Sequence, residues 1–581
     1  MIQDHFRILA FDLSIGRGTF VEMEGRDTVA GGSGLAALLF EKYGRRNESW
    51  DVPDQPLIFA IGPLTGYFPL MSKTVCAFKS PYHDQYAESH GGGRSALSFR
   101  FAGLDALVVI GKAKVPSVLS FGSRHIELKE APYLWGMDVH QSGKILRHIC
   151  PGSGHRSILR IGPAGERGSA IAGINVDTFR HFGRLGAGAV MGAKNLKAIV
   201  ILGDGNFPLP DNPEYPRLFQ EVFQQVTATP MMSKYHNLGT PENVAVLNGI
   251  KALPCRNLQQ TSDPAMEGIT GERFARDTLL RNAACSGCPV GCIHLGFVRE
   301  KFQEENQYFF RQVSYDHEPI FAAGSMLGLT NCFAVLALLD VAEKEGLDVM
   351  SAGVALAWAT EASEKGLISE RETIVPLKFG DGQKYKEALH HLSRGSNEFY
   401  LLLSQGTMKP AERFGGADFA CVLGQEMAGY ATGEVFFISQ ALGLRHSHLD
   451  TGGYSFDQKA KDKNVGEAIK FLLEDERERV LLTSMVSCLF ARNVYKEELL
   501  ARCLQSVGYT ALGDHLPAVS QRLQNLRWKN RLGTGYKPRE VGIPRRFTEI
   551  STWKGGVDEG FMNSLKSAYA EKIVEMASTG A

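Results

Sequence analysis

The sequence predicts an α+β protein whose β-rich N-terminal third is followed by two mostly α-helical parts. Short apolar runs between glycines and prolines fill roughly the first two hundred residues, as expected of strands joined by turns. Helical periodicity prevails in the remainder of the chain. Between the two textures lies 207–216, which holds four prolines and is typical of a linker. We therefore divide the chain into residues 1–206, 207–415 and 416–581.

The composition argues against several classes of function. The 581 residues include 63 Lys+Arg and 63 Asp+Glu, and this zero formal charge argues against a nucleic-acid partner. The start of the chain has no basic segment followed by an apolar one, which indicates that there is no signal peptide. The longest largely apolar run, Ser325–Leu339, is too short to span a bilayer. We therefore expect a cytoplasmic protein without a membrane span, in which clustered cysteines bind metal.

The elements follow from the spacing of apolar residues. In the N-terminal part, short apolar runs bounded by glycine or proline predict strands, and Ser33–Tyr43 alone has helical periodicity. The predicted strands include Pro56–Ile61, Ala106–Ile110, Val115–Ser120 and Leu196–Leu202. The predicted helices of the remainder are Tyr215–Val226, Gly271–Asn282, Asn331–Glu345, Val354–Lys365, Tyr385–Ser393, Gly466–Leu482 and Asn563–Met576.

Three cysteines lie close together in the middle of the chain. Cys285, Cys288 and Cys292 have the spacing C-x2-C-x3-C, and the intervening glycines and proline let the backbone wrap so that three thiolates converge. Soft thiolates suit an iron–sulfur cluster or a zinc ion. His294 follows too closely for a usual zinc ligand pair, so a cluster is the favoured hypothesis and structural zinc is the alternative. A [4Fe–4S] cluster needs a fourth cysteine, which the spacing alone does not select.

Three glycine-rich segments, 30–35, 90–94 and 183–192, crowd into the N-terminal part. Backbone amides in such loops bind phosphate oxygens, so we expect an anionic, phosphate-bearing ligand. A Rossmann turn is rejected for the last segment, because Asp177–Phe182 before it is not predicted to be a strand and Leu196–Leu202 follows it. A hydrolase is rejected because no G-x-S-x-G motif accompanies the second segment.

Four motifs occur in one order along the chain. They are Gly62-Pro-Leu-Thr-Gly66, Phe101-Ala-Gly-Leu-Asp105, Val190-Met-Gly-Ala-Lys-Asn-Leu-Lys197 and the cysteine triplet. Together they resemble the aldehyde:ferredoxin oxidoreductase family of tungsten enzymes, and the similarity runs from about Val29 to Phe547. The resemblance implies a bis-pterin cofactor that carries tungsten or molybdenum beside one [4Fe–4S] cluster. It also implies that the β-rich N-terminal domain forms a base for the pterins, with two helical domains above it.

The resemblance implies roles for single residues. The family's fourth cluster ligand lies well after the triplet in a Cys-x-Phe context, which selects Cys488 as the metal ligand beside the triplet. The segment Asp316-His-Glu-Pro319 resembles the one that carries the family's active-site glutamate, which gives Glu318. Gly443–Leu449 resembles the region of its active-site histidine, for which we choose His448, with His446 as the substitute.

Further residues are implied to hold the pterins and the magnesium ion that bridges their phosphates. The family's acidic pterin element has Glu in its first place in Glu343-Lys-Glu-Gly-Leu-Asp348, and its second copy, Thr483–Cys488, has lost both the Asp and the Gly-Leu. Lys73 replaces an arginine expected between cluster and pterin, which keeps the charge but loses the planar fork. The implied cofactor-binding residues are Lys73, His90, Gly91, Gly92, Gly93, Arg94, Arg184, Leu185, Gly186, Glu343, Leu347, Asp348 and Thr483.

By this resemblance, the protein is expected to oxidise an aldehyde, or to reduce the acid, and to pass electrons through the cluster to ferredoxin or a partner subunit. One alternative uses the same cofactors for another low-potential reduction, of an acyl-CoA or an aromatic ring. The other alternative is a non-catalytic scaffold that zinc staples at the cysteines. The sequence leaves open the substrate, the choice between tungsten and molybdenum, and whether a homodimer forms.

Overall fold

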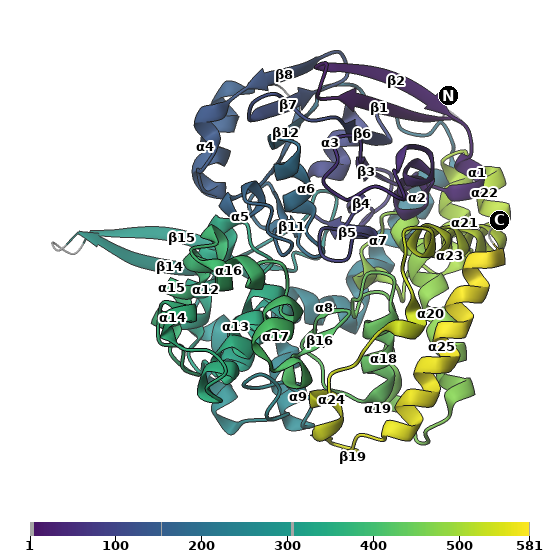
Figure 1. The fold of residues 1–581 in the computed structure, drawn as a ribbon. Helices are drawn as coiled ribbons and strands as arrows, with labels where there is room; N and C mark the ends of the chain where they lie inside the picture. The colour runs from purple at the N-terminus through teal and green to yellow at the C-terminus, as the bar shows by residue number, and fades with distance from the viewer. Residues whose placement is uncertain (1–4, 153, 304–306, 580–581) are drawn as a thin grey trace.

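The computed structural model describes residues 5–152, 154–303 and 307–579. Two six-stranded sheets form its N-terminal part, and helices dominate the remainder, so the predicted α+β fold class is confirmed (Figure 1). The first sheet has the order β2-β1-β6-β3-β4-β5 and comprises β1 (Phe6–Asp12), β2 (Arg17–Met23), β3 (Leu57–Ala60), β4 (Thr74–Lys79), β5 (Tyr86–Gly91) and β6 (Ala106–Ile110). The second has the order β11-β10-β9-β12-β7-β8 and comprises β7 (Ser117–Phe121), β8 (Ile126–Glu130), β9 (His155–Arg160), β10 (Ile174–Val176), β11 (Arg180–Phe182) and β12 (Leu196–Gly203).

Strands β3 and β6, in the middle of the first sheet, are apolar throughout because both of their faces are buried. On β6, Leu107 and Val109 pack with Leu119 of the second sheet in a core between the two sheets. Val108, between them, joins the large core that is shared with the helices. Successive side chains of a strand point to opposite faces, so a strand covered on both sides reads as a continuous apolar run.

The helices of the N-terminal part fill the connections between its strands. They are α1 (Arg26–Val29), α2 (Gly32–Tyr43), α3 (Ser95–Phe101), α4 (Val139–Ile149), α5 (Pro163–Glu166) and α6 (Ala187–Ala193). The helices of the middle of the chain are α7 (Glu214–Ala228), α8 (Pro230–Asn237), α9 (Glu242–Gly249), α10 (Gly271–Asp277), α11 (His317–Ala323), α12 (Cys332–Glu345), α13 (Val349–Glu364), α14 (Glu370–Thr373), α15 (Gly382–Arg394), α16 (Glu398–Leu403) and α17 (Met408–Phe414). The last ones are α18 (Glu434–Leu442), α19 (Gly453–Lys459), α20 (Val465–Ser484), α21 (Glu497–Ser506), α22 (Thr510–Asp514), α23 (Leu516–Gly533), α24 (Arg546–Glu549) and α25 (Glu559–Thr579).

The helices form two groups beneath the β-rich part. Figure 1 shows α12, α13 and α15 on one side and α18, α20, α23 and α25 on the other. Local sequence explains the α12–α13 corner, which is the predicted pterin element. Helix α12 ends at Gly346, which has the left-handed φ of 73°, and Asp348 then caps α13 by accepting from Met350 N and Ser351 N. The corner therefore turns a carboxylate toward the N-terminal end of α13.

Two sequence predictions are wrong, one in the middle of the chain and one in the N-terminal part. Helix α10 ends at Asp277, and the rest of the predicted helix Gly271–Asn282 is strand β13 (Leu279–Ala283). This strand pairs with β14, so ladder hydrogen bonds replace the last helical turns. Within the segment Asp177–Phe182, the last three residues form β11, a short antiparallel edge strand. A strand of that length and direction still does not make a Rossmann turn.

A long hairpin was not predicted at all. Strands β14 (Ile293–Gln303) and β15 (Gln307–Tyr315) pair antiparallel and extend away from the body of the molecule (Figure 1). At the base of the hairpin, Arg311 forms ion pairs with Asp340 at 2.6 Å and with Glu300 at 2.7 Å. The hairpin begins directly after Cys292, so it continues one of the segments of the site described next.

Within the described residues, no single helix is long and apolar enough to cross a membrane, although the bent pair His317–Leu327 and Cys332–Glu345 together meet that criterion of length and composition.

Candidate active site

The four cysteines predicted to bind a cluster lie on two segments that meet. The triplet occupies the loop between β13 and β14, and Cys488 follows α20. The turn around Leu70 joins these segments, because Leu70 N donates to Gly287 O at 3.2 Å and Leu70 O accepts from Cys488 N at 2.9 Å. A remote cysteine is thereby held beside the triplet, where the prediction placed it.

Glycines of the N-terminal part allow the backbone of the segment before Cys488 to pack closely against them. A Cβ on Gly32 would lie 2.3 Å from Thr483 O, and a Cβ on Gly62 would lie 2.4 Å from Met485 O. Gly32 also has a φ of 41°, which side chains rarely adopt. The first glycine-rich segment thus allows close backbone approach.

The four predicted ligands differ from the other cysteines in exposure. All ten cysteines are free thiols, and only Cys285, Cys288, Cys292 and Cys488 are partly exposed, whereas the other six are buried. Burial, and to a lesser extent the neighbouring thiols of Cys488 and Cys285, raise the pKa of Cys288 to about 12. Burial likewise raises the pKa of Cys292, against the opposing charge of Arg180. Thiolates in such surroundings require a bound metal or nearby cations.

The donor set fits a cluster better than a zinc ion. Among residues 5–152, 154–303 and 307–579, no group of three or more His, Cys, Asp and Glu could hold a metal ion. The side chain of His294 is engaged elsewhere, since its Nε2 lies 2.7 Å from Asn237 O. Four thiolates around a [4Fe–4S] cluster each bind a different iron, so they stand further apart than the ligands of one ion. The described part of the chain thus shows no compact ligand set of the kind that holds a single zinc ion.

The second glycine-rich segment lies against the cysteines. Gly93 N lies 3.2 Å from the Cys285 Sγ, and a Cβ on Gly92 would lie 2.9 Å from that sulfur and 3.2 Å from the Lys73 Nζ. The structure thus brings Lys73 and this loop to the candidate cluster site. Arg94 is exposed, and its backbone N–H donates to Asp177 at 3.3 Å.

The predicted acid–base pair is brought together. Glu318 lies in the first turn of α11, and His448 lies in the loop after α18. The His448 Nε2 lies 3.1 Å from the Glu318 Oε1, and the Tyr430 hydroxyl donates to the same oxygen at 3.0 Å. His446, the substitute, is held elsewhere, because its Nδ1 lies 2.9 Å from Ala441 O. The geometry favours His448 over His446, and the catalytic roles stay predictions.

The pKa values of Glu318 and Tyr430 are shifted in opposite directions. Burial is the largest influence on Glu318 and raises its pKa, but the hydrogen bond and charge of His448 outweigh it, with help from His317, and lower the pKa to about 2. Burial raises the pKa of Tyr430 well above its usual value, and the charge of Glu318 adds to this. At neutral pH the site therefore holds a carboxylate base beside a protonated phenol.

The first predicted pterin element, Glu343–Asp348, keeps an acidic residue at Asp348, which pairs with Arg184. Arg184 Nε donates to Asp348 at 3.4 Å, and Arg184 Nη2 donates to Glu426 O at 2.6 Å. Glu343 instead lies 2.8 Å from the His181 Nε2. Leu347 is buried beside this corner.

In the loop before α6, Leu185 and Gly186 have left-handed φ values of 68° and 84°.

Buried polar atoms around Arg184 lack protein partners. Among the described residues these include the Arg184 Nη1, the Gln425 Oε1 and the Glu426 Oε2. A buried donor or acceptor without a partner costs about 1–3 kcal/mol, so such atoms in one region point to a polar ligand. A pterin, with ring N–H groups and phosphate oxygens, offers both donors and acceptors. The residues present therefore fit that group.

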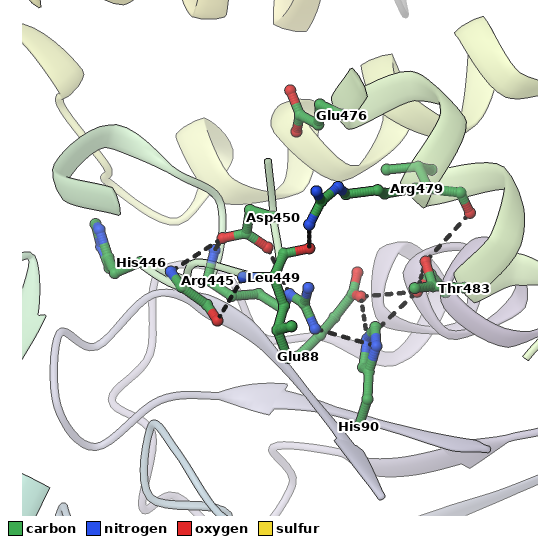
Figure 2. A network of polar contacts seen from close by, with 12 residues as sticks. Glu88, His90, Arg445, His446, Leu449, Asp450, Glu476, Arg479 and Thr483 are labelled. Carbon is green, nitrogen blue, oxygen red and sulfur yellow. Dashed lines mark hydrogen bonds and ion pairs between the residues drawn. The ribbon is translucent and has the colours of Figure 1, made fainter. Parts of the chain in front are cut away.

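At the second pterin element a buried network replaces the lost acid. The Thr483 hydroxyl accepts from the Ser33 hydroxyl at 3.0 Å, and Ser33 lies 2.9 Å from Glu88. Figure 2 shows Glu88 and His90 beside Thr483, with Arg445 approaching from the other side. Burial raises the pKa of Glu88. The charge of Arg527, whose Nε lies 2.7 Å from the Glu88 Oε1, and the hydrogen bonds of His90 and Arg527 outweigh burial and lower this pKa below its usual range.

The same network holds the loop that carries His448. Arg445 Nη1 lies 3.1 Å from the His90 Nδ1, and Arg445 Nε donates to Asp450 at 2.6 Å. Burial, and then the charge of Arg445, lower the pKa of His90 to about 4. A neutral His90 accepts from Arg445 at Nδ1 and donates to Glu88 from Nε2 at 3.0 Å. The strand β5 is thus joined through one imidazole to the loop that carries His448.

The network residues Glu88, Arg445, Asp450 and Arg527 were not predicted from the sequence. Glu88 carries the one available signal, a charged residue inside a strand that is otherwise almost fully buried. Its partner Arg527 is 439 positions away, so no local pattern connects them.

Comparisons with known proteins identify the family of this chain. The family model described as "Aldehyde ferredoxin oxidoreductase, N-terminal domain" matches residues 8–203, and that described as "domains 2 & 3" of the same family matches residues 217–573. A tungsten-containing aldehyde ferredoxin oxidoreductase of Pyrococcus horikoshii is 28% identical over 88% of this chain and 86% of that protein. Its namesake in Pyrococcus abyssi is 31% identical over 65% of this chain and 62% of that protein.

A solved structure has the same fold. It is the active-site complex BamBC of benzoyl coenzyme A reductase with 1,5-dienoyl-CoA, and the superposition has a TM-score of 0.80. It covers 99% of this chain and 98% of the other, at 17% sequence identity, so the likeness concerns the fold. Together the two family models match most of the sequence in one order. The chain belongs to the aldehyde ferredoxin oxidoreductase family.

Proposed function

We propose that the protein is an oxidoreductase that oxidises an aldehyde to the acid, or runs the reverse reaction, with a tungsten or molybdenum bis-pterin, a magnesium ion bridging the pterin phosphates and one [4Fe–4S] cluster. The observation that carries this proposal is the meeting of Cys488 with the triplet, in a chain that also joins Glu318 to His448. The cysteines would hold the cluster, and Arg184, Asp348 and their neighbours would hold pterin. When bound, the metal–pterin group supplies two-electron redox chemistry, and the cluster supplies one-electron transfer.

The protein's own part of the reaction is proton transfer. An aldehyde and one water yield an acid, two protons and two electrons, so a base must take a proton near the carbonyl carbon. Glu318 is that base. Both His448 and Tyr430 contact its Oε1, which leaves the Oε2 to accept the proton. The neighbouring His448 orients the carboxylate through its contact with the Oε1.

A second candidate is the reduction of an acyl-CoA or an aromatic ring with the same cofactors. The similarity of fold to a complex that contains 1,5-dienoyl-CoA supports it. In that reaction Glu318 and His448 would deliver protons instead of removing them. Both candidates require the same metals, and their substrates differ.

Metal analysis combined with a substrate panel tests the proposal. We expect anaerobically purified protein to contain one tungsten or molybdenum and about four irons per chain. Aldehydes, acyl-CoA thioesters and their reduced forms are then assayed with viologen dyes. Dye reduction by aldehydes alone supports the first candidate, and turnover of thioesters alone supports the second. Zinc without iron would contradict both.

We also propose where a ferredoxin or electron-transfer subunit approaches. A cavity of about 430 Å³ is lined by Cys288 and Pro289 at the candidate cluster site and by Phe219 and Phe223 of α7. The two phenylalanines are 38% and 42% exposed and stack with centroids 6.4 Å apart. Exposed aromatic side chains beside a redox centre suit a contact with a partner protein.

Replacing both phenylalanines tests this surface. With a two-[4Fe–4S] ferredoxin as acceptor, we expect F219S/F223S to raise the KM for ferredoxin roughly tenfold, the loss typical of a truncated aromatic anchor. The KM for a viologen dye should not change, because a small dye needs no docking surface. The matched control is Phe20→Ser on β2, which is 42% exposed and does not line this cavity. An unchanged KM for ferredoxin in F219S/F223S would contradict the proposal.

A further inference from the structure

Arg180 lies between the candidate cluster site and the segment that carries Glu318. It belongs to the edge strand β11, and none of the motifs above includes it. Its Nη1 donates to the Asp316 Oδ2 at 3.2 Å. Its Nε is buried and, among the described residues, has no hydrogen-bond partner. The guanidinium therefore has a free donor as well as an ionic partner.

The stem of Arg180 packs on the glycines beside Cys285. The position of a Cβ on Gly92 is 2.9 Å from the Cys285 Sγ and 3.6 Å from the Arg180 Cδ. A Cβ on Gly93 would lie 3.7 Å from the Arg180 Cβ. The absence of side chains at these glycines thus lets the arginine approach the sulfur.

The electrostatics agree with this position. Burial is the largest influence on Arg180 and lowers its pKa, but the charges of Asp316, Cys285 and Cys292 outweigh it and raise the pKa. The arginine in turn opposes the effect of burial on Cys292. Arg180 is therefore a permanent positive charge that acts on two of the four sulfurs.

Asp316 connects this charge to the acid–base pair. It immediately precedes α11, and its carbonyl accepts from Ile320 N at 3.1 Å. Glu318 is two residues further on, and the Thr240 hydroxyl donates to the Asp316 Oδ1 at 3.4 Å. One ion pair thus joins the candidate electron-transfer site to the candidate proton-transfer site.

We propose that Arg180 sets the reduction potential of the cluster and that Asp316 offsets part of its effect. This inference rests on the proposed function, because it needs a cluster at the four cysteines. Reduction adds one negative charge to the cluster, so a nearby cation favours the reduced form and a nearby anion disfavours it. Arg180 therefore makes the potential more positive, and Asp316 makes it more negative. Both are positioning residues, since neither is placed to touch the substrate.

The test is an EPR-monitored redox titration of the cluster in the holoenzyme. We expect R180M to shift the midpoint potential to a more negative value and D316N to shift it to a more positive value. R180K should shift it less than R180M, because lysine keeps the charge and loses the fork. Asparagine at position 316 remains a good residue before a helix, so D316N should fold. The matched control is R311M, which breaks an ion pair with buried Asp340 at 2.6 Å and should leave the potential unchanged.

The opposite signs separate an electrostatic role from a structural one. A residue that merely supports the cluster would cause loss of signal in both variants, or shifts of one direction. Such shifts, or no shift in either variant, would overturn the inference. The proposed function would still stand, because the wild-type holoenzyme gives a cluster signal. A wild-type holoenzyme without any cluster signal would overturn the proposed function itself, and the inference with it. If R180M loses its cluster, R180K and D316N still decide the sign.

Discussion

Replacing Cys488 with serine is expected to remove most of the iron and the visible absorption of the cluster. Cys488 is the one candidate ligand outside the triplet, and its backbone N–H is fixed by Leu70 O at 2.9 Å. A thiolate binds iron–sulfur clusters far better than a hydroxyl, so a [4Fe–4S] cluster with three cysteines left is labile. Iron content and visible spectra of anaerobically purified protein provide the measurement.

The control for this variant is Cys503→Ser. Cys503 is a fully buried thiol on α21, and burial raises its pKa to about 12, as expected of an inert packing residue. We expect this variant to keep its iron, with at most a loss of stability from the new buried hydroxyl. Full iron content in Cys488→Ser would refute the ligand assignment and the proposed cluster with it.

Replacing Glu318 with glutamine is expected to lower kcat by about 10²–10⁴, the usual worth of a general base. Glutamine keeps the shape and the hydrogen bond from Tyr430, but it cannot accept a proton. Because the pKa of Glu318 is lowered to about 2, the carboxylate is ionised throughout the neutral range. The pH dependence of the wild-type rate near neutrality must then come from another group.

Metal analysis of Glu318→Gln distinguishes loss of the base from loss of a cofactor. Tungsten or molybdenum and iron should stay bound in Glu318→Gln, because none of the candidate cofactor contacts uses this side chain. Glu387→Gln on α15 is the matched control, since Glu387 is paired with Lys384 at 3.1 Å on the helix surface. Full activity of Glu318→Gln with a substrate that the wild type turns over would remove the proposed role.

The sequence allowed the prediction of elements and residues that local patterns mark. The buried strand Ala106–Ile110 has the residues predicted for it, because an apolar run between glycines leaves few other structures. Cys488, Glu318 and His448 followed from resemblance, and in the structure Cys488 lies beside the triplet and Glu318 beside His448. Their spacing along the chain gives no sign of this proximity.

What could not be predicted depends on distant partners. Strand β13 replaces the end of a predicted helix because β14 pairs with it, and that pairing is tertiary. Glu88 has its role through Arg527 on α23, and Arg180 has its role through Asp316 on another segment. A charged residue in a strand marks a site of interest, but its partner is set by the fold.

The pair of Glu88 and Arg527 also limits how this protein can vary. One member belongs to the sheets and the other to the last helical group, and both are almost completely buried. Loss of either member from a buried pair costs about 3–5 kcal/mol, whereas exchange of both for matching residues costs far less. A chimera that takes its N-terminal half from one relative and its C-terminal half from another is therefore compatible only if the two halves supply matching residues at these two positions. The two halves are separate in sequence, yet they are not interchangeable modules.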